Sequence, residues 1–430
     1  MLALLLTAAL AAVAPRILSL EQALQTADEH QPDLRAERSN VDIVSSRADE
    51  TRAGLFPQVS LNAARIWRTG NYVAQPGLLG NGIRAATTSQ SSGQLYNGYS
   101  ATATVSQLLF DFGQNFFRWR SARSLAEAEV DSFNAERLLI RLNVRVAYFN
   151  AHAQKLLFEV AKGTWSNEEK HLVQTQGFVD VGTQPEIALA QEKTAEANAR
   201  LQLIQSENGY LTSKVQLNQA MGVEGSEEYD VEDLAPAPVQ GEDRDLDSLM
   251  QEALAARPEF QSLQRQVHAE ELLVDSVRGA YFPALSLQLN GTEGGVALNA
   301  LAWNVSGQLL LTWPIFQGLL TRAQSAEAWA LVRQLEAHRD SVRLQVRLEV
   351  EQARLGVRAA GAELRAAGEA LTNANDRLRL AEGRYQTGVG SVIELGDAQV
   401  ALTTAAAQRV KSEYDLATTR AQLTKALGRG

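Results

Sequence analysis

The most regular pattern in the chain is a run of small and branched apolar residues between positions 346 and 381, spaced alternately by four and three. This heptad pattern of period 3.5 predicts a helix that winds against a neighbouring helix. Gly388 and Gly390 predict the end of that helix, and Ser391 can cap a second helix that runs back. The pattern therefore predicts a long helical hairpin with a tight tip. Its apolar seam comprises Val346, Val350, Ala353, Val357, Ala360, Leu364, Ala367, Leu371, Ala374, Leu378 and Ala381.

A pattern of period two appears in two other regions, at about 57–110 and 283–312. In the first region Val59 and Leu61 alternate with Ser60 and Asn62, as in a strand with one apolar face. The polar stretch 69–98 predicts a long loop between the two strands. Each strand pair is followed by a helical pattern, and we expect long helical hairpins at about 114–221 and 317–428.

The order of these elements occurs twice. Gln31-Pro32-Asp33-Leu34 is echoed 226 residues later by Arg257-Pro258-Glu259-Phe260, and Phe56-Pro57 is echoed by Phe282-Pro283 at the same offset. Three glycine pairs, offset by 205 or 206, continue the match: Gly113 with Gly318, Gly182 with Gly388, and Gly222 with Gly428. We therefore expect a first repeat at 15–222, a linker at 223–246 and a second repeat at 247–430.

Composition and charge narrow the class of protein. The 430 residues are 45% hydrophobic but only 6% aromatic, which favours helices over β-sandwiches. A net charge of −10 argues against a nucleic-acid partner. Cysteine is absent, which excludes disulfides and thiolate metal sites.

Residues 1–14 are mostly apolar and end in Ala12-Val13-Ala14. This stretch is too short to span a bilayer, and its small residues fit an export signal with cleavage near residue 14. The alternative is a buried N-terminal helix.

The predicted strands constrain the assembly. Strands of about 10 residues suit a tilted membrane crossing, but four strands cannot close a barrel, and open edges are not tolerated in lipid. If these strands span a membrane, several chains must share one barrel. The alternative is an ordinary soluble β-layer beside helical bundles.

Several motifs resemble the TolC family of outer-membrane efflux channels. They are Phe56-Pro57 and Phe282-Pro283 before the strands, residues 109–113 and 314–318 before the long helices, and the tips at 181–183 and 385–388. The resemblance implies a homotrimer in which twelve strands form one outer-membrane β-barrel, continuous with a periplasmic barrel of twelve helices. The predicted fold is thus mainly α with a small β part.

The same resemblance implies a duct for efflux of small molecules, driven by an inner-membrane transporter and a periplasmic adaptor. One alternative is the exit duct of a type I protein-secretion system. An alternative of another class is a soluble periplasmic coiled-coil scaffold.

The sequence contains no recognisable catalytic constellation. The five histidines are scattered without metal-ligand spacing, and no phosphate-binding glycine loop is present. We therefore predict no enzymatic activity, no cofactor and no metal.

The candidate functional residues lie at the hairpin tips. Glu394 and Asp397 are three residues apart and share one helix face. By resemblance to TolC-like channels, they ring the periplasmic aperture, and Tyr385 contributes a hydrogen bond that holds it shut. The equivalent of Glu394 in the first repeat, Ala188, carries no charge. The alternative is a pair of carboxylates on a solvated face.

The resemblance also implies that the adaptor docks on the tips, whereas the alternative is that the tip glycines only turn the chain. The expected docking residues are Val181, Gly182, Thr183, Thr387, Gly388 and Val389.

In a shared barrel the two strand faces have different environments. The expected lipid-facing residues are Val59, Leu61, Leu285, Leu287, Trp303 and Val305. The expected lumen-facing residues are Ser60, Asn62, Ser286, Gln288 and Asn304.

Overall fold

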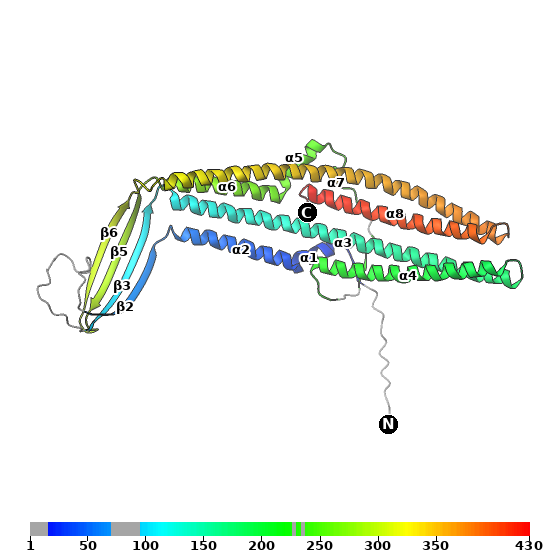
Figure 1. The fold of residues 1–430 in the computed structure, drawn as a ribbon, viewed down its shortest axis with the longest axis horizontal. Helices are drawn as coiled ribbons and strands as arrows, with labels where there is room; N and C mark the ends of the chain where they lie inside the picture. Colours follow the sequence, from blue (N-terminus) through cyan, green and yellow to red (C-terminus); the bar gives the residue numbers. More distant parts are fainter. Residues whose placement is uncertain (1–15, 70–94, 226–228, 234–236) are drawn as a thin grey trace, which may run out of the picture. The chain divides into compact units, whose positions relative to one another are not determined.

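The structure is a computed structural model that describes residues 16–69, 95–225, 229–233 and 237–430 (Figure 1). The predicted export signal at 1–14 and most of the predicted polar loop at 69–98 lie outside these residues.

The duplicated order of elements is confirmed, and the fold is mainly helical with a small β part. The first copy contains α1 (Leu20–His30), α2 (Pro32–Ala53), β2 (Gln58–Thr69), β3 (Leu95–Phe110), α3 (Gln114–Asp180) and α4 (Glu186–Met221). The second copy contains α5 (Leu246–Ala256), α6 (Pro258–Gly279), β5 (Ala284–Gly295), β6 (Leu301–Thr312), α7 (Leu320–Gln386) and α8 (Val392–Ala426). Two short strands, β1 (Arg16–Leu18) and β4 (Tyr229–Val231), form a separate parallel pair.

The glycine pairs that indicated the duplication share one backbone conformation. Gly182 and Gly388 have φ of 75° and 76°, and Gly222 and Gly428 have φ of 71° and 72°. Left-handed backbone of this kind is common where a helix ends, and glycine adopts it without a steric penalty. The chain therefore turns in the same way at equivalent points of both copies.

The chain divides into two compact units, and each draws on both copies. One comprises Met1–Val41, Ala128–Gln264 and Ala337–Gly430, and the other comprises Asp42–Glu127 and Arg265–Glu336. The β-hairpins belong to the second unit, and the tips of the helical hairpins belong to the first.

In the second unit, four strands form one antiparallel sheet in the order β2-β3-β5-β6. The register places Leu61, Ala103, Gly291 and Val305 in one row across the sheet, so the apolar residues predicted to share a face do so. The other face carries polar contacts, such as those from Thr104 Oγ1 to Asn290 Oδ1 at 3.0 Å and from Gln308 Nε2 to Gln288 Oε1 at 2.8 Å. Among the described strands, β2 and β6 each have a neighbour on one side only.

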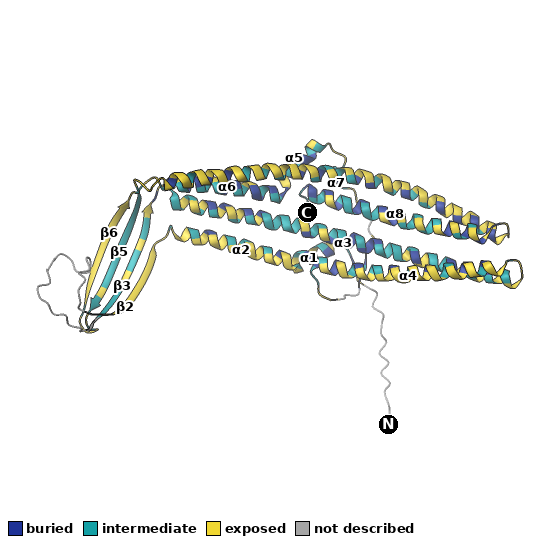
Figure 2. Cartoon of the chain, viewed as in Figure 1, coloured by how far each residue is buried: buried dark blue, intermediate teal, exposed yellow. Residues whose placement is uncertain are grey.

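In the first unit, the predicted heptad seam of α7 packs as expected. Val346 and Val350 are buried in a cluster with residues of α5 and α8, and Ala381 is buried in a second cluster near the tip. Figure 2 shows the long helices with alternating buried and exposed faces. Helix α8 begins at the predicted cap, since Ser391 accepts a hydrogen bond from the backbone N–H of Glu394.

A double ion pair holds α1 against α3 in this unit. Arg137 and Arg141 each donate two hydrogen bonds to the carboxylate of Asp28, with Nη2–Oδ2 distances of 2.7 and 2.6 Å. Burial alone would raise the pKa of Asp28, but these two guanidinium groups outweigh it and lower the pKa to about 2. Asp28 therefore stays ionised in the folded protein over almost the whole pH range.

Among the described residues, we find no helix with the length and apolar character needed to cross a membrane.

Candidate functional site

The tip of the second helical hairpin is a short turn closed by two backbone hydrogen bonds. The N–H of Gly388 donates to the carbonyl of Tyr385 at 3.0 Å, and the N–H of Val389 donates to that of Arg384 at 3.0 Å. This pair of bonds is a Schellman motif, which satisfies the last carbonyls of α7. A Cβ atom on Gly390 would lie 2.9 Å from the backbone nitrogen of Tyr385, so only glycine fits there without a shift.

The tip of the first hairpin has the same construction. The N–H of Gly182 donates to the carbonyl of Val179, and the N–H of Thr183 donates to that of Phe178, both at 2.9 Å. Val181 and Val389 leave 73% and 72% of their surface exposed at the two tips. The residues predicted to dock the adaptor are thus accessible in the chain, but docking itself stays a prediction.

The two carboxylates predicted at the aperture lie on the first turns of α8. Asp397 is exposed and Glu394 is half-buried. Glu394 Oε1 lies 3.0 Å from Arg384 Nε across the turn, and sequence reasoning missed this ion pair. The guanidinium group offsets one of the two negative charges, so the acidic character of this surface is weaker than the sequence suggested.

Tyr385, the third predicted aperture residue, is buried between the two hairpins. Its hydroxyl oxygen lies 2.7 Å from Thr175 Oγ1, and its ring packs edge-on against Phe178 with centroids 5.7 Å apart. Both partners belong to the first hairpin. Tyr385 therefore links the tips of the two hairpins within one chain, and its proposed role in closing an aperture stays a prediction.

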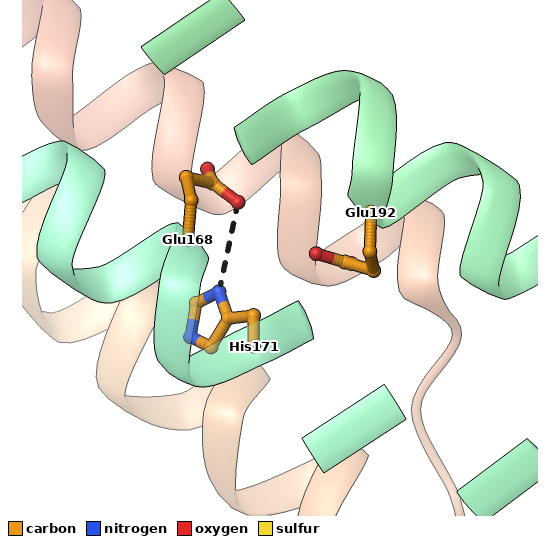
Figure 3. Close-up of side chains that lie close together, drawn as sticks. All are labelled: Glu168, His171 and Glu192. Carbon is orange, nitrogen blue, oxygen red and sulfur yellow. Dashed lines mark ion pairs between the residues drawn. The ribbon is translucent and has the colours of Figure 1, made fainter. Parts of the chain in front are cut away.

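Next to this contact, the structure brings together polar residues that the sequence did not single out. Glu168 and His171 on α3 and Glu192 on α4 are all buried, with ligand atoms within 4.8 Å of one another. Figure 3 shows the carboxylate of Glu192 turned toward the Glu168–His171 pair. His171 Nδ1 lies 4.0 Å from Glu168 Oε2, and its Nε2 lies 3.6 Å from Glu382 Oε1 on α7.

Burial dominates the electrostatics of this cluster. It raises the pKa of Glu168, and together with the charge of Glu168 it raises the pKa of Glu192 to about 7. Burial lowers the pKa of His171, although Glu382 acts in the opposite direction. The cluster therefore holds its groups with their charged forms disfavoured, which is unusual in a helix interface.

Sequence reasoning treated His171 as an isolated histidine. Glu192 and Glu382 lie on other helices, and the sequence did not show that the helix face shared by Glu168 and His171 is buried. One signal was available. Glu168, Thr175 and Glu192 each lie 206 residues before an alanine of the second repeat: Ala374, Ala381 and Ala398. Polar residues at positions where the other copy has seam alanines indicate a polar interior.

A duplicated chain with an amphipathic antiparallel sheet and two 67-residue helices defines a class of outer-membrane channel proteins. Residues 23–223 and 249–429 match the family described as outer membrane efflux protein, and these ranges cover most of both repeats. The chain belongs to the outer membrane efflux protein family. The expected family and location in the outer membrane are thereby confirmed, and the scaffold alternative is not supported.

Individual relatives agree with this assignment. The toluene efflux pump outer membrane protein TtgC of Pseudomonas putida is 25% identical over 431 residues, covering 96% of this chain and 83% of the relative. Protein CyaE of Bordetella pertussis is 26% identical over 388 residues, covering 89% of this chain and 78% of CyaE. The outer membrane channel CmeC of Campylobacter jejuni has a similar fold, with a TM-score of 0.80, 17% identity, and coverage of 95% of this chain and 85% of CmeC.

Proposed function

We propose that three copies of this chain form a passive duct through the outer membrane that carries small molecules out of the cell. The observation that carries this proposal is the four-stranded sheet with one apolar face and a free edge on each side. Val59, Leu61 and Trp303 leave 73%, 74% and 80% of their surface exposed on that face. In water, the apolar face and the unpaired edges of an isolated sheet would promote aggregation. In lipid, the same edges would leave backbone N–H and C=O groups without hydrogen-bond partners.

Pairing of β6 of one copy with β2 of the next removes both problems at once. Three sheets then close into one barrel of twelve strands, with the apolar face toward lipid and the polar ladder toward the lumen. Barrels of eight strands are filled by their own side chains, whereas those of sixteen or more leave an aqueous channel. Twelve strands lie between these limits and leave room for a lumen.

The long helices supply the second part of the duct. Helices α3, α4, α7 and α8 from three copies make twelve, and their alanine-rich seams permit close lateral packing. We place this helical tunnel in the periplasm, where it receives material at the tips.

The duct performs no chemical step in this proposal. Transport energy comes from an inner-membrane transporter, which a periplasmic adaptor links to the two exposed tips. Family membership supports such partners, and so do the names of relatives, which include toluene and antibiotic efflux pump components. These names favour small molecules as the cargo.

The strand faces offer a direct test. Leu287→Arg places a charge on the proposed lipid face, at a cost of about 2–4 kcal/mol near the membrane centre. We expect this variant to lose the trimer in outer-membrane extracts. Ser286→Arg, the matched control on the opposite face, should assemble normally and change only conductance. Equal assembly of the two variants contradicts the proposed barrel.

Tip docking has its own test. A photo-crosslinker at Thr183 or Val389 should capture a co-expressed adaptor, while one at exposed mid-helix Leu355 should not. Capture at Leu355 alone contradicts docking at the tips and leaves the barrel proposal intact.

A further inference from the structure

The buried cluster at the first hairpin has the composition and placement of a metal site. We propose that Glu168, His171 and Glu192 bind a divalent transition-metal cation, for which Zn²⁺ is the best candidate. The site lies on α3 and α4 (Figure 3), whereas Glu394 and Asp397 belong to α8.

The geometry is close to what a metal requires. One ligand atom from each residue lies within 4.8 Å of the others. Zn²⁺ holds histidine nitrogen and carboxylate oxygen at about 2.0–2.2 Å, so tetrahedral ligand atoms lie about 3.3 Å apart. Rotation about the bonds of the long glutamate side chains moves their carboxylate oxygens by roughly an ångström or two, which brings the ligand atoms to this separation without a change in the backbone.

The histidine is oriented for coordination. Nδ1 faces Glu168 at 4.0 Å, and Nε2 faces Glu382 of α7 at 3.6 Å on the other side of the ring. A proton on Nε2 that points toward Glu382 leaves the lone pair of Nδ1 available for a metal. Carboxylates commonly support metal-bound histidines in this way. Glu382 therefore acts as a positioning residue, because it orients the ring of His171.

An unpartnered atom within the cluster points to a missing ligand. Glu192 is only 3% exposed, yet its Oε2 has no hydrogen-bond partner among the described residues. A buried carboxylate without a partner is costly, and a second buried carboxylate beside it adds repulsion. A bound cation satisfies both carboxylates and offsets this cost.

The second copy shows that the fold does not need these charges. Ala374 and Ala398 occupy the positions of Glu168 and Glu192, and both alanines are buried. The first copy therefore keeps a polar interior that packing alone does not require, as expected of a ligand site.

The donor set selects the class of metal. One imidazole with two carboxylates suits Zn²⁺ and other borderline transition metals, whereas Mg²⁺ and Ca²⁺ prefer oxygen alone. Because the ligands come from both legs of the first hairpin, with Glu382 from α7 beside them, a bound ion joins these helices near their tips.

The test uses the full-length purified protein in detergent, stripped with a chelator and then titrated with Zn²⁺ against a chromophoric competitor. We expect one high-affinity Zn²⁺ per chain. Glu192→Gln, which keeps the shape of the side chain, and His171→Asn should each weaken binding at least about 100-fold. The matched control is His268→Asn. His268 forms an exposed pair with Glu271 at 3.4 Å and has the same three-residue spacing, so its loss should leave the affinity unchanged.

Binding of Co²⁺ gives an independent readout at the same site. The visible spectrum of the Co²⁺ form should report a histidine ligand that disappears in His171→Asn but persists in His268→Asn. Circular dichroism verifies that each variant folds. If the wild type binds Zn²⁺ no more tightly than the Glu192→Gln variant, the metal site does not exist. That result leaves the proposed duct untouched, because trimer assembly and conductance are measured separately.

Discussion

The tips of the two helical hairpins have the same backbone and opposite interiors. Both end in a Schellman turn at a glycine with φ near 75°, at Gly182 and Gly388. Behind the first turn lie the buried side chains of Glu168, Thr175 and Glu192, whereas the second has a buried alanine at each equivalent position. The residues of the turn therefore determine where each hairpin ends, whereas the side chains packed behind the turn differ between the two copies.

This difference separates what the fold requires from what it only permits. The alanines of the second copy allow close helix packing at no cost in desolvation. The polar groups of the first copy reduce stability unless something satisfies them. Comparison of the two copies thus shows which buried side chains the hairpin needs, because the same turn forms with alanines behind it in one copy and with polar residues in the other.

The largest expected effect comes from moving a carboxylate between the copies. Ala398→Glu places a charge at a position that is 0% exposed in an apolar cluster, and it should cost about 3 kcal/mol or more. The melting temperature of the detergent-extracted protein and hydrogen exchange at the second tip measure this loss. Glu192→Ala, the reverse change, should be neutral or stabilising in the presence of chelator. Similar losses of stability in both variants would mean that each interior depends equally on its own side chains, which would contradict the difference between the copies.

A second comparison lies away from the tips, between α1–α3 and α5–α7. In the first copy, Arg137 and Arg141 hold Asp28. In the second copy, Leu254 occupies the position of Asp28, and it lines a cavity of about 720 Å³ with Arg343 and Arg347, which occupy the positions of the two arginines. The pKa of Asp28 is lowered to about 2, so its ion pair stabilises the folded state above pH 4 and stops doing so as pH falls through 2.

Asp28→Asn should therefore lower stability by about 1–2 kcal/mol at pH 7 and have progressively less effect as the pH falls from 4 to 2. Thermal melts across this pH range measure the effect. Asp275→Asn, which removes an exposed pair with Arg278, is the control and should change little. A destabilisation by Asp28→Asn that does not vary with pH would contradict the assigned ion pair.

A smaller effect is expected at the link between the hairpins. Tyr385→Phe removes the hydroxyl that meets Thr175 at 2.7 Å and should cost about 1 kcal/mol. Adding Thr175→Val should recover part of this loss, since the buried threonine hydroxyl is then gone as well. Tyr281→Phe, at an exposed tyrosine, is the control. Additive losses in the double variant would show that the two hydroxyls do not interact.

The smallest effect on stability, but a clear effect on conduction, is expected from the carboxylates of α8. The first copy has Ala188 where the second has Glu394, so the Glu394–Asp397 pair has no counterpart at the first tip. Glu394→Ala with Asp397→Ala should weaken cation selectivity and remove block by millimolar divalent cation from the periplasmic side. Arg384→Ala should strengthen both, because it removes the charge that pairs with Glu394. Unchanged selectivity in the double variant would place the acidic gate elsewhere.

The sequence predicted the parts of the fold that depend on local periodicity. The heptad seam of α7 and the shared face of the strands follow from residues close together in the chain. The ion pair between Arg384 and Glu394 was missed because it forms across a turn. The cluster was missed because Glu192 lies on α4 while Glu168 and His171 lie on α3, and only tertiary packing brings the three together.

The proposed trimeric duct is tested most directly by the conductance of the purified protein in a planar bilayer, together with its native mass. We expect a mass of three chains and discrete, cation-selective channels. A monomeric protein that remains soluble without detergent and leaves the bilayer electrically silent would contradict it.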